Sequence, residues 1–102
     1  MSRGRFADVI RRQLDLFERD EAALIAECEA AEDAYDKADR DEAEERYADY
    51  LDLVETGTEL VAGLRDTFAS TMEEETAEDY EEEFNRAVRV RLPRFALEIE
   101  DL

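Results

Sequence analysis

The sequence predicts an all-α protein: an antiparallel, coiled-coil-like helical hairpin with a shorter third helix docked on one flank, that is, a three-helix bundle with an apolar C-terminal tail. Two long series of apolar residues alternate spacings of three and four, as at the a and d positions of a heptad. Residues that interrupt helices are scarce, with 3 glycines and 1 proline. The hydrophobic fraction of 44% is that of a globular chain, so the net charge of -18 does not indicate disorder. A length of 102 residues predicts a single domain over residues 1–102.

The first helix is expected over residues of about 4–37 and the second over about 40–72. The first series comprises Ala7, Ile10, Leu14, Phe17, Glu21, Leu24, Cys28, Ala31 and Tyr35, and the second comprises Ala43, Tyr47, Tyr50, Val54, Gly57, Val61, Leu64, Phe68 and Thr71. The two series are out of phase by one residue, so the helix must break between them. Asp39 followed by Glu42 resembles a capping box, which favours a helix start at this point. One continuous helix with a stutter is the alternative.

Folding the chain back at residue 39 places each member of the first series opposite a member of the second. Large residues then meet small ones, as Cys28 meets Tyr50, and close packing requires such matching. The one charged member, Glu21, meets Gly57. We interpret the Glu21/Gly57 pair as a polar layer that sets the register of the hairpin. A bound ligand, a metal or a partner's arginine is the alternative, but no second inward carboxylate is evident beside Glu21.

The third helix is expected over residues of about 76–92, where large apolar residues recur every four positions until Pro93. Apolar residues beside the two series, such as Leu16 and Leu60, should form a groove on one flank of the hairpin, which the third helix should fill. The arginines near its end should then lie beside Asp20, Glu21 and Glu27. Whether this helix packs on its own chain or is exchanged between two chains stays open.

The tail, residues 93–102, should be extended, because its apolar residues Phe95, Leu97 and Ile99 alternate with others. A tail with this many large apolar residues is not expected to be free in solvent. It could cover the rest of the groove, add to another chain or form a short helix.

The composition excludes several kinds of chemistry. Without histidine there is no Ser-His-Asp or Cys-His catalysis and no His-ligated zinc or haem, and the glycines are too far apart for a phosphate-binding loop. No apolar run approaches the roughly 18 residues that cross a bilayer, and the N-terminus does not resemble a signal peptide. The single Cys28 fits a reducing cytoplasm. We therefore expect a cytoplasmic protein that is not an enzyme and has no catalytic residues, cofactor, metal or membrane contact.

Acidic residues concentrate in residues 20–85, whereas both ends of the chain carry a small excess of arginine. Nucleic-acid phosphates and anionic lipids should repel such a chain, so direct binding to nucleic acid is not expected. The acid excess serves either salt tolerance or recognition of a partner, and the sequence leaves both open.

These observations favour a non-enzymatic helical module for protein–protein interaction or assembly. It should form a homodimer and bind another protein through the apolar groove and the tail. The expected contacts are Phe95, Leu97 and Ile99, oriented by Arg89, Arg91 and Arg94, with a second apolar spot at Ile25 and Leu51. The alternatives are an acidic nucleic-acid mimic that binds a basic protein and, less favoured for want of paired inward carboxylates, a carboxylate metal-binding protein.

Overall fold

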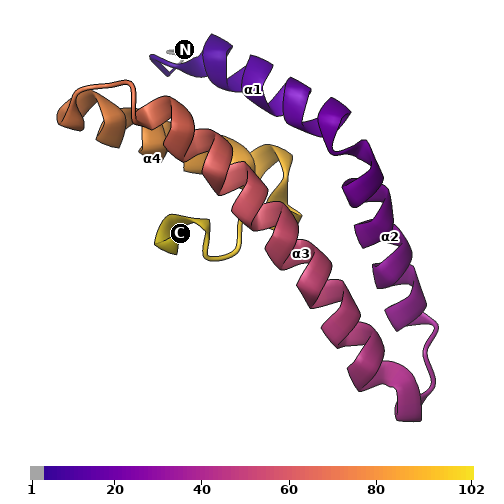
Figure 1. The fold of residues 1–102 in the computed structure, drawn as a ribbon. Helices are drawn as coiled ribbons and strands as arrows, with labels where there is room; N and C mark the ends of the chain where they lie inside the picture. Colours follow the sequence, from indigo (N-terminus) through magenta and orange to yellow (C-terminus); the bar gives the residue numbers. More distant parts are fainter. Residues whose placement is uncertain (1–3) are drawn as a thin grey trace.

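The computed structural model describes residues 4–102, and the described residues are helical with no strand. The elements are α1 (Ala7–Asp20), α2 (Ala22–Asp36), α3 (Arg40–Ala69), α4 (Glu74–Arg91) and two short 3-10 turns, η1 (Pro93–Phe95) and η2 (Ile99–Asp101). They form an elongated molecule with extents of 51 × 26 × 23 Å (Figure 1). The all-α prediction is confirmed. The predicted number of long helices was wrong, because the segment expected as one first helix is divided into α1 and α2.

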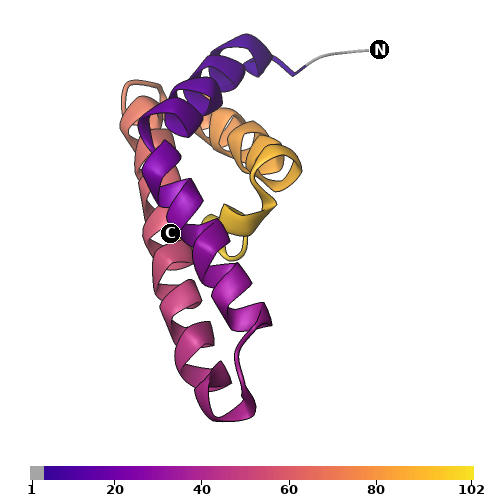
Figure 2. The ribbon, with the colours of Figure 1, turned by 90° about the vertical axis from the view of Figure 1, so that its right-hand side faces the viewer.

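The division between α1 and α2 lies at Glu21, the charged member of the first apolar series. Its backbone leaves the helical region, with φ -107° and ψ 26°. Main-chain hydrogen bonds nevertheless continue, from the Glu21 N–H to the Phe17 oxygen and from the Ile25 N–H to the Glu21 oxygen. Neither glycine nor proline stands here, so no local residue explains the bend. The bend directs α1 away from α3 and across α4 (Figures 1 and 2). There α1 buries Ile10 and Leu14.

Helices α2 and α3 run side by side in opposite directions from the connection at residues 37–39 (Figures 1 and 2). At that end the rings of Tyr35 and Tyr47 have centroids 5.1 Å apart. Helix α3 begins directly after Asp39, as predicted, but the Asp39 side chain makes no capping hydrogen bond. Its main-chain oxygen instead accepts from the Glu42 and Ala43 N–H groups. Periodicity and an extended Asp39 are therefore sufficient to start the helix.

Helix α4 contributes the centre of the core through Tyr80, Phe84 and Val88, each fully buried. The Tyr80 ring lies 5.4 Å from Phe6 and 5.0 Å from Phe68, measured between centroids. Burial raises the pKa of Tyr80 to about 12, against the opposing effect of its hydrogen bond to the Gln13 side chain. The predicted apolar stripe is thus the face of α4 that packs against α1 and α3.

The flank on which α4 docks differs from the prediction. On α3 the buried residues beside the apolar series are Thr58, Ala62, Arg65 and Ala69, each one position after a member of the series. Leu60 and Gly63, on the flank expected to receive the helix, stay exposed. Both flanks of the hairpin carry small or apolar residues, so periodicity alone did not discriminate between them.

The tail is folded rather than extended. Phe95 and Ile99 are buried, whereas Leu97 is 77% exposed. Between Leu97 and Ile99, Glu98 adopts the left-handed conformation with φ 61°, which is uncommon for a residue other than glycine. This turn places Ile99 in the core and leaves Leu97 in solvent. The expected extended conformation was therefore wrong, and η1 and η2 agree with the alternative of a short helix.

Gly57 and Phe95 pack together in a way that the pairing of the hairpin did not predict. A Cβ added to Gly57 would lie 2.2 Å from Cε1 of Phe95. The Phe95 ring therefore occupies the space that the prediction left for Glu21. The same ring packs edge-on against Phe17, with ring centroids 5.9 Å apart. Gly57 is needed so that the tail can approach α3.

Alanine at the two helical glycines of α3 should have opposite effects on stability. Gly57→Ala forces the Phe95 ring to move and should lower the free energy of unfolding by about 1–3 kcal/mol. Gly63→Ala meets no atom within 4 Å and should raise it by up to about 1 kcal/mol, because alanine is the better helix former. Urea denaturation followed by circular dichroism measures both. Equal stability of the two variants would contradict the Gly57–Phe95 contact.

Candidate protein-interaction surface

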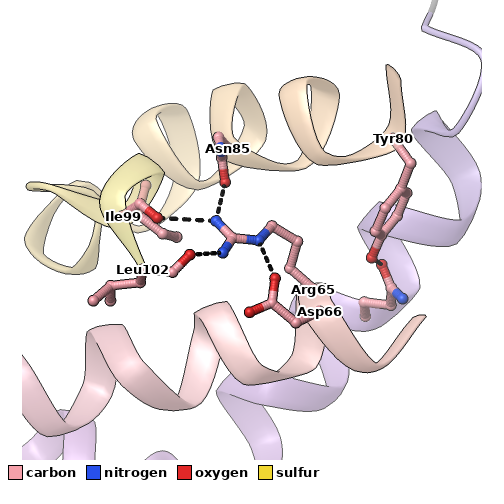
Figure 3. Close-up of polar contacts among 7 residues, drawn as sticks. Arg65, Asp66, Tyr80, Asn85, Ile99 and Leu102 are labelled. Atoms are coloured by element: carbon pink, nitrogen blue, oxygen red, sulfur yellow. Dashed lines mark hydrogen bonds and ion pairs between the residues drawn. The ribbon is translucent and has the colours of Figure 1, made fainter. Parts of the chain in front are cut away.

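Arg65, near the C-terminal end of α3, holds the tail in place, and only 2% of this residue is exposed (Figure 3). Its Nη1 donates to Oδ1 of Asn85 at 2.9 Å and to the main-chain oxygen of Ile99 at 2.9 Å. Its Nη2 donates to the main-chain oxygen of Leu102 at 2.7 Å, and its Nε donates to Asp66 at 2.8 Å. One guanidinium thus joins α3, α4 and the tail.

The structural role of Arg65 was not predicted from the sequence. The available signal was its place beside Leu64 on the same flank as Ala62 and Ala69, where a long charged side chain among small residues is unusual. A buried arginine needs several acceptors. Main-chain oxygens of a folded tail supply two of them, and their position is not visible in the sequence.

The three arginines expected to orient a partner are engaged within the chain. Arg89 pairs with Glu100, and Arg91 pairs with Asp15 and Glu18. Arg94 contacts Glu32 at 3.0 Å and donates to the hydroxyl of Tyr50 at 3.2 Å. Their partners are therefore not the predicted Asp20, Glu21 and Glu27. The pairs of Arg91 and Arg94 attach α4 and η1 to the first two helices, and the pair of Arg89 attaches α4 to η2.

The predicted apolar contacts fall into two groups. Phe95 and Ile99 lie in the core and present no surface to a partner in this fold, and Ile25 is partly buried against the core. Leu97 and Leu51 come together with Leu102, which is 53% exposed. We call Leu51, Leu97 and Leu102 the tail patch. They border a concavity of about 320 Å³ with Glu55, Glu59 and Glu98 also at its lining.

A second apolar surface lies between α1 and α3, where α1 bends away. It is a groove of about 640 Å³, which we call the α1–α3 groove. Leu16 and Leu60, each nearly half exposed, stand beside it. The groove is lined by Gln13, Leu16, Phe17, Asp20, Glu21, Glu59, Leu60, Gly63, Leu64, Thr67, Phe68 and Thr71. It occupies the flank that the sequence predicted for the third helix.

The arrangement of the possible metal ligands and of the thiol Cys28 can be described for residues 4–102. The described residues contain no group of three or more aspartate, glutamate, cysteine or histidine side chains placed to hold a metal ion. Cys28 is buried, and burial raises the pKa of its thiol, against a lowering effect of Arg94. A thiol in that setting is protonated at neutral pH and is a poor nucleophile.

Within the part of the chain that the structure describes, no helix has the length and apolar character needed to cross a membrane. Two of the apolar surfaces on the described residues are the tail patch and the α1–α3 groove, each with carboxylates around it. Comparison of the chain with known protein families, curated proteins and solved structures finds no match.

Proposed function

We propose that this chain is a non-enzymatic helical assembly module that forms a homodimer through the tail patch. The observation that carries the proposal is the gathering of Leu51, Leu97 and Leu102 at one place on the surface. Leu97 is 77% exposed although it lies in a tail that is anchored on both sides of it by Phe95 and Ile99. An apolar side chain held in solvent by an ordered backbone is suited to contact a partner with little loss of conformational entropy.

Self-association through the tail patch should strengthen with salt. Each copy carries a net charge of -18, and Glu55, Glu59 and Glu98 surround the patch. Two copies therefore repel one another at low ionic strength, and salt screens this repulsion. The apolar contact itself also strengthens in salts that are excluded from the protein surface.

The test is light scattering of the full chain and two matched variants across low and molar salt. Leu97→Asp places a charge in the tail patch, whereas Val90→Asp places one at an 82% exposed residue that does not line the patch. We expect a dimer for the unaltered chain and for Val90→Asp at molar salt, and a monomer for Leu97→Asp. A chain that is monomeric at every salt level, or a dimeric Leu97→Asp, would overturn the proposal.

Truncation after Pro93 is a less specific test of the tail. It removes Phe95 and Ile99, which belong to the core, together with Leu97, which belongs to the patch. Loss of association after truncation would therefore also follow from partial unfolding. The point substitution at Leu97 avoids this ambiguity, because exposed positions tolerate a charge with little effect on stability.

The alternative function is an acidic mimic of nucleic acid that binds a basic protein. The observation that favours it is the exposed carboxylates on the first half of α4, Glu74, Glu75, Glu78, Asp79 and Glu82. Binding by such a surface weakens steeply as salt rises, whereas dimer formation through the tail patch strengthens. The sign of the salt dependence therefore discriminates between the two functions.

A further inference from the structure

Two features of the fold leave the α1–α3 groove open to solvent. The bend at Glu21 carries α1 away from α3, and α4 docks on the opposite flank of α3. Phe17, Leu64 and Phe68 line the groove as apolar side chains of the core region. The lining residues on α3 run from Glu59 to Phe68, which corresponds to about 14 Å of helix. A partner helix of about three turns matches this length.

The charges around the groove select the chemistry of its occupant. Its charged lining residues are Asp20, Glu21 and Glu59, and no lysine or arginine among residues 4–102 lines it. A second copy of this chain would be repelled at low salt here as at the tail patch, because its net charge is -18, and its Arg89, Arg91 and Arg94 are already paired within the chain. A helix with apolar residues on one face and arginine or lysine on the other complements both the apolar walls and the acidic rim.

Gly63 gives independent support for an occupant. It lies within the 30-residue helix α3, where glycine costs roughly 1 kcal/mol relative to alanine. The close packing of the Phe95 ring explains why a glycine stands at residue 57. A Cβ at Gly63, by contrast, would meet nothing within 4 Å. Gly63 faces the groove, and the absence of a side chain there allows another backbone or ring to approach α3 closely.

We propose that the α1–α3 groove binds a cationic amphipathic helix of a partner protein. Apolar residues of that helix at positions i, i+3 or i+4, and i+7 contact Leu16, Leu60 and the surface left open by Gly63. Its arginine or lysine residues pair with Asp20, Glu21 and Glu59. This site shares Glu59 with the concavity beside the tail patch but none of the leucines of the patch, so the proposal goes beyond dimer formation and does not depend on it.

The test uses the full-length chain and a fluorescein-labelled helical peptide of about 14 residues, with leucines on one face and arginines on the other. Fluorescence anisotropy measures binding at near-physiological salt. A control peptide of the same composition, with the leucines and arginines shuffled so that no apolar face forms, separates groove binding from charge attraction. We expect the amphipathic peptide to bind at least 10-fold more tightly than the shuffled one. Equal affinities would overturn the proposal.

Variants of the protein locate the binding. Gly63→Leu fills the open space without a clash at its Cβ and favours the helix, so the fold should be kept while peptide affinity falls at least 10-fold. Leu97→Asp, in the tail patch, should leave the affinity unchanged. Circular dichroism checks that both variants fold. A Gly63→Leu variant that folds and binds as well as the unaltered chain would also overturn the proposal, whether or not the chain dimerises.

Discussion

Replacing Phe95 with alanine should lower the free energy of unfolding by about 3–5 kcal/mol, the usual cost of deleting a buried aromatic ring. The ring is 1% exposed, packs against the bare backbone of Gly57 and meets Phe17 edge-on. Its removal leaves a cavity between α3, α1 and the tail. Because whole domains of this size are stable by only about 5–15 kcal/mol, the variant should be close to unfolding at room temperature.

Urea denaturation followed by circular dichroism measures the effect of Phe95→Ala. Leu97→Ala is the matched control, because it removes a large apolar side chain from the same tail at an exposed position. This control should change the free energy of unfolding by less than about 0.5 kcal/mol. If Phe95→Ala were as stable as Leu97→Ala, the tail would not be part of the core.

Arg65→Met should lower the free energy of unfolding by about 3 kcal/mol, because several polar groups lose a hydrogen-bond donor while the apolar volume is kept. The Asn85 side chain and the main-chain oxygens of Ile99 and Leu102 would each lack the guanidinium donor. A buried polar group left without a partner costs about 1–3 kcal/mol, and solvent reaching the end of the tail reduces the sum. The tail should therefore detach before the rest of the molecule unfolds.

Hydrogen exchange of the tail amides, together with urea denaturation, tests the role of Arg65. In Arg65→Met the amide of Ile99 should exchange much faster than in the unaltered chain. Arg89→Met is the control, because Arg89 makes an exposed ion pair with Glu100 worth about 0–1 kcal/mol. Arg65→Lys keeps the charge but not the planar fork of donors, so its stability should be intermediate. If the amide of Ile99 exchanged at the same rate in Arg65→Met and Arg89→Met, Arg65 would not be the residue that holds the tail in place.

The helices themselves were largely predictable from the sequence. The apolar spacing located α2, α3 and the buried stripe of α4, and Asp39 and Pro93 located two of the breaks, whereas nothing in the sequence located the break at Glu21. Helix α3 begins after Asp39 as expected, and α4 ends at Arg91, one residue before the predicted end and two before Pro93. These features depend on interactions within a few turns of helix, which a sequence displays directly.

The candidate surfaces were only partly predictable. Leu51 and Leu97 were expected to contact a partner, and the structure leaves both exposed and close together. Phe95 and Ile99 were expected to do the same, and the structure buries both. The four residues look alike in the sequence, because each is a large apolar side chain. The left-handed turn at Glu98 exposes Leu97 and buries Ile99, and the space beside Gly57 receives the buried Phe95 ring.

The sequence by itself determined that this chain is helical, where α2 ends, α3 begins and α4 ends to within one residue, and which faces are apolar. Only the tertiary structure decided the bend at Glu21, the flank that receives α4 and the folding of the tail onto Arg65. The physical reason is that both flanks of the hairpin offer apolar area of similar kind, so burial alone does not choose between them. The choice comes from shape and hydrogen bonding across segments far apart in the chain, namely Phe95 against Gly57 and Arg65 against Ile99.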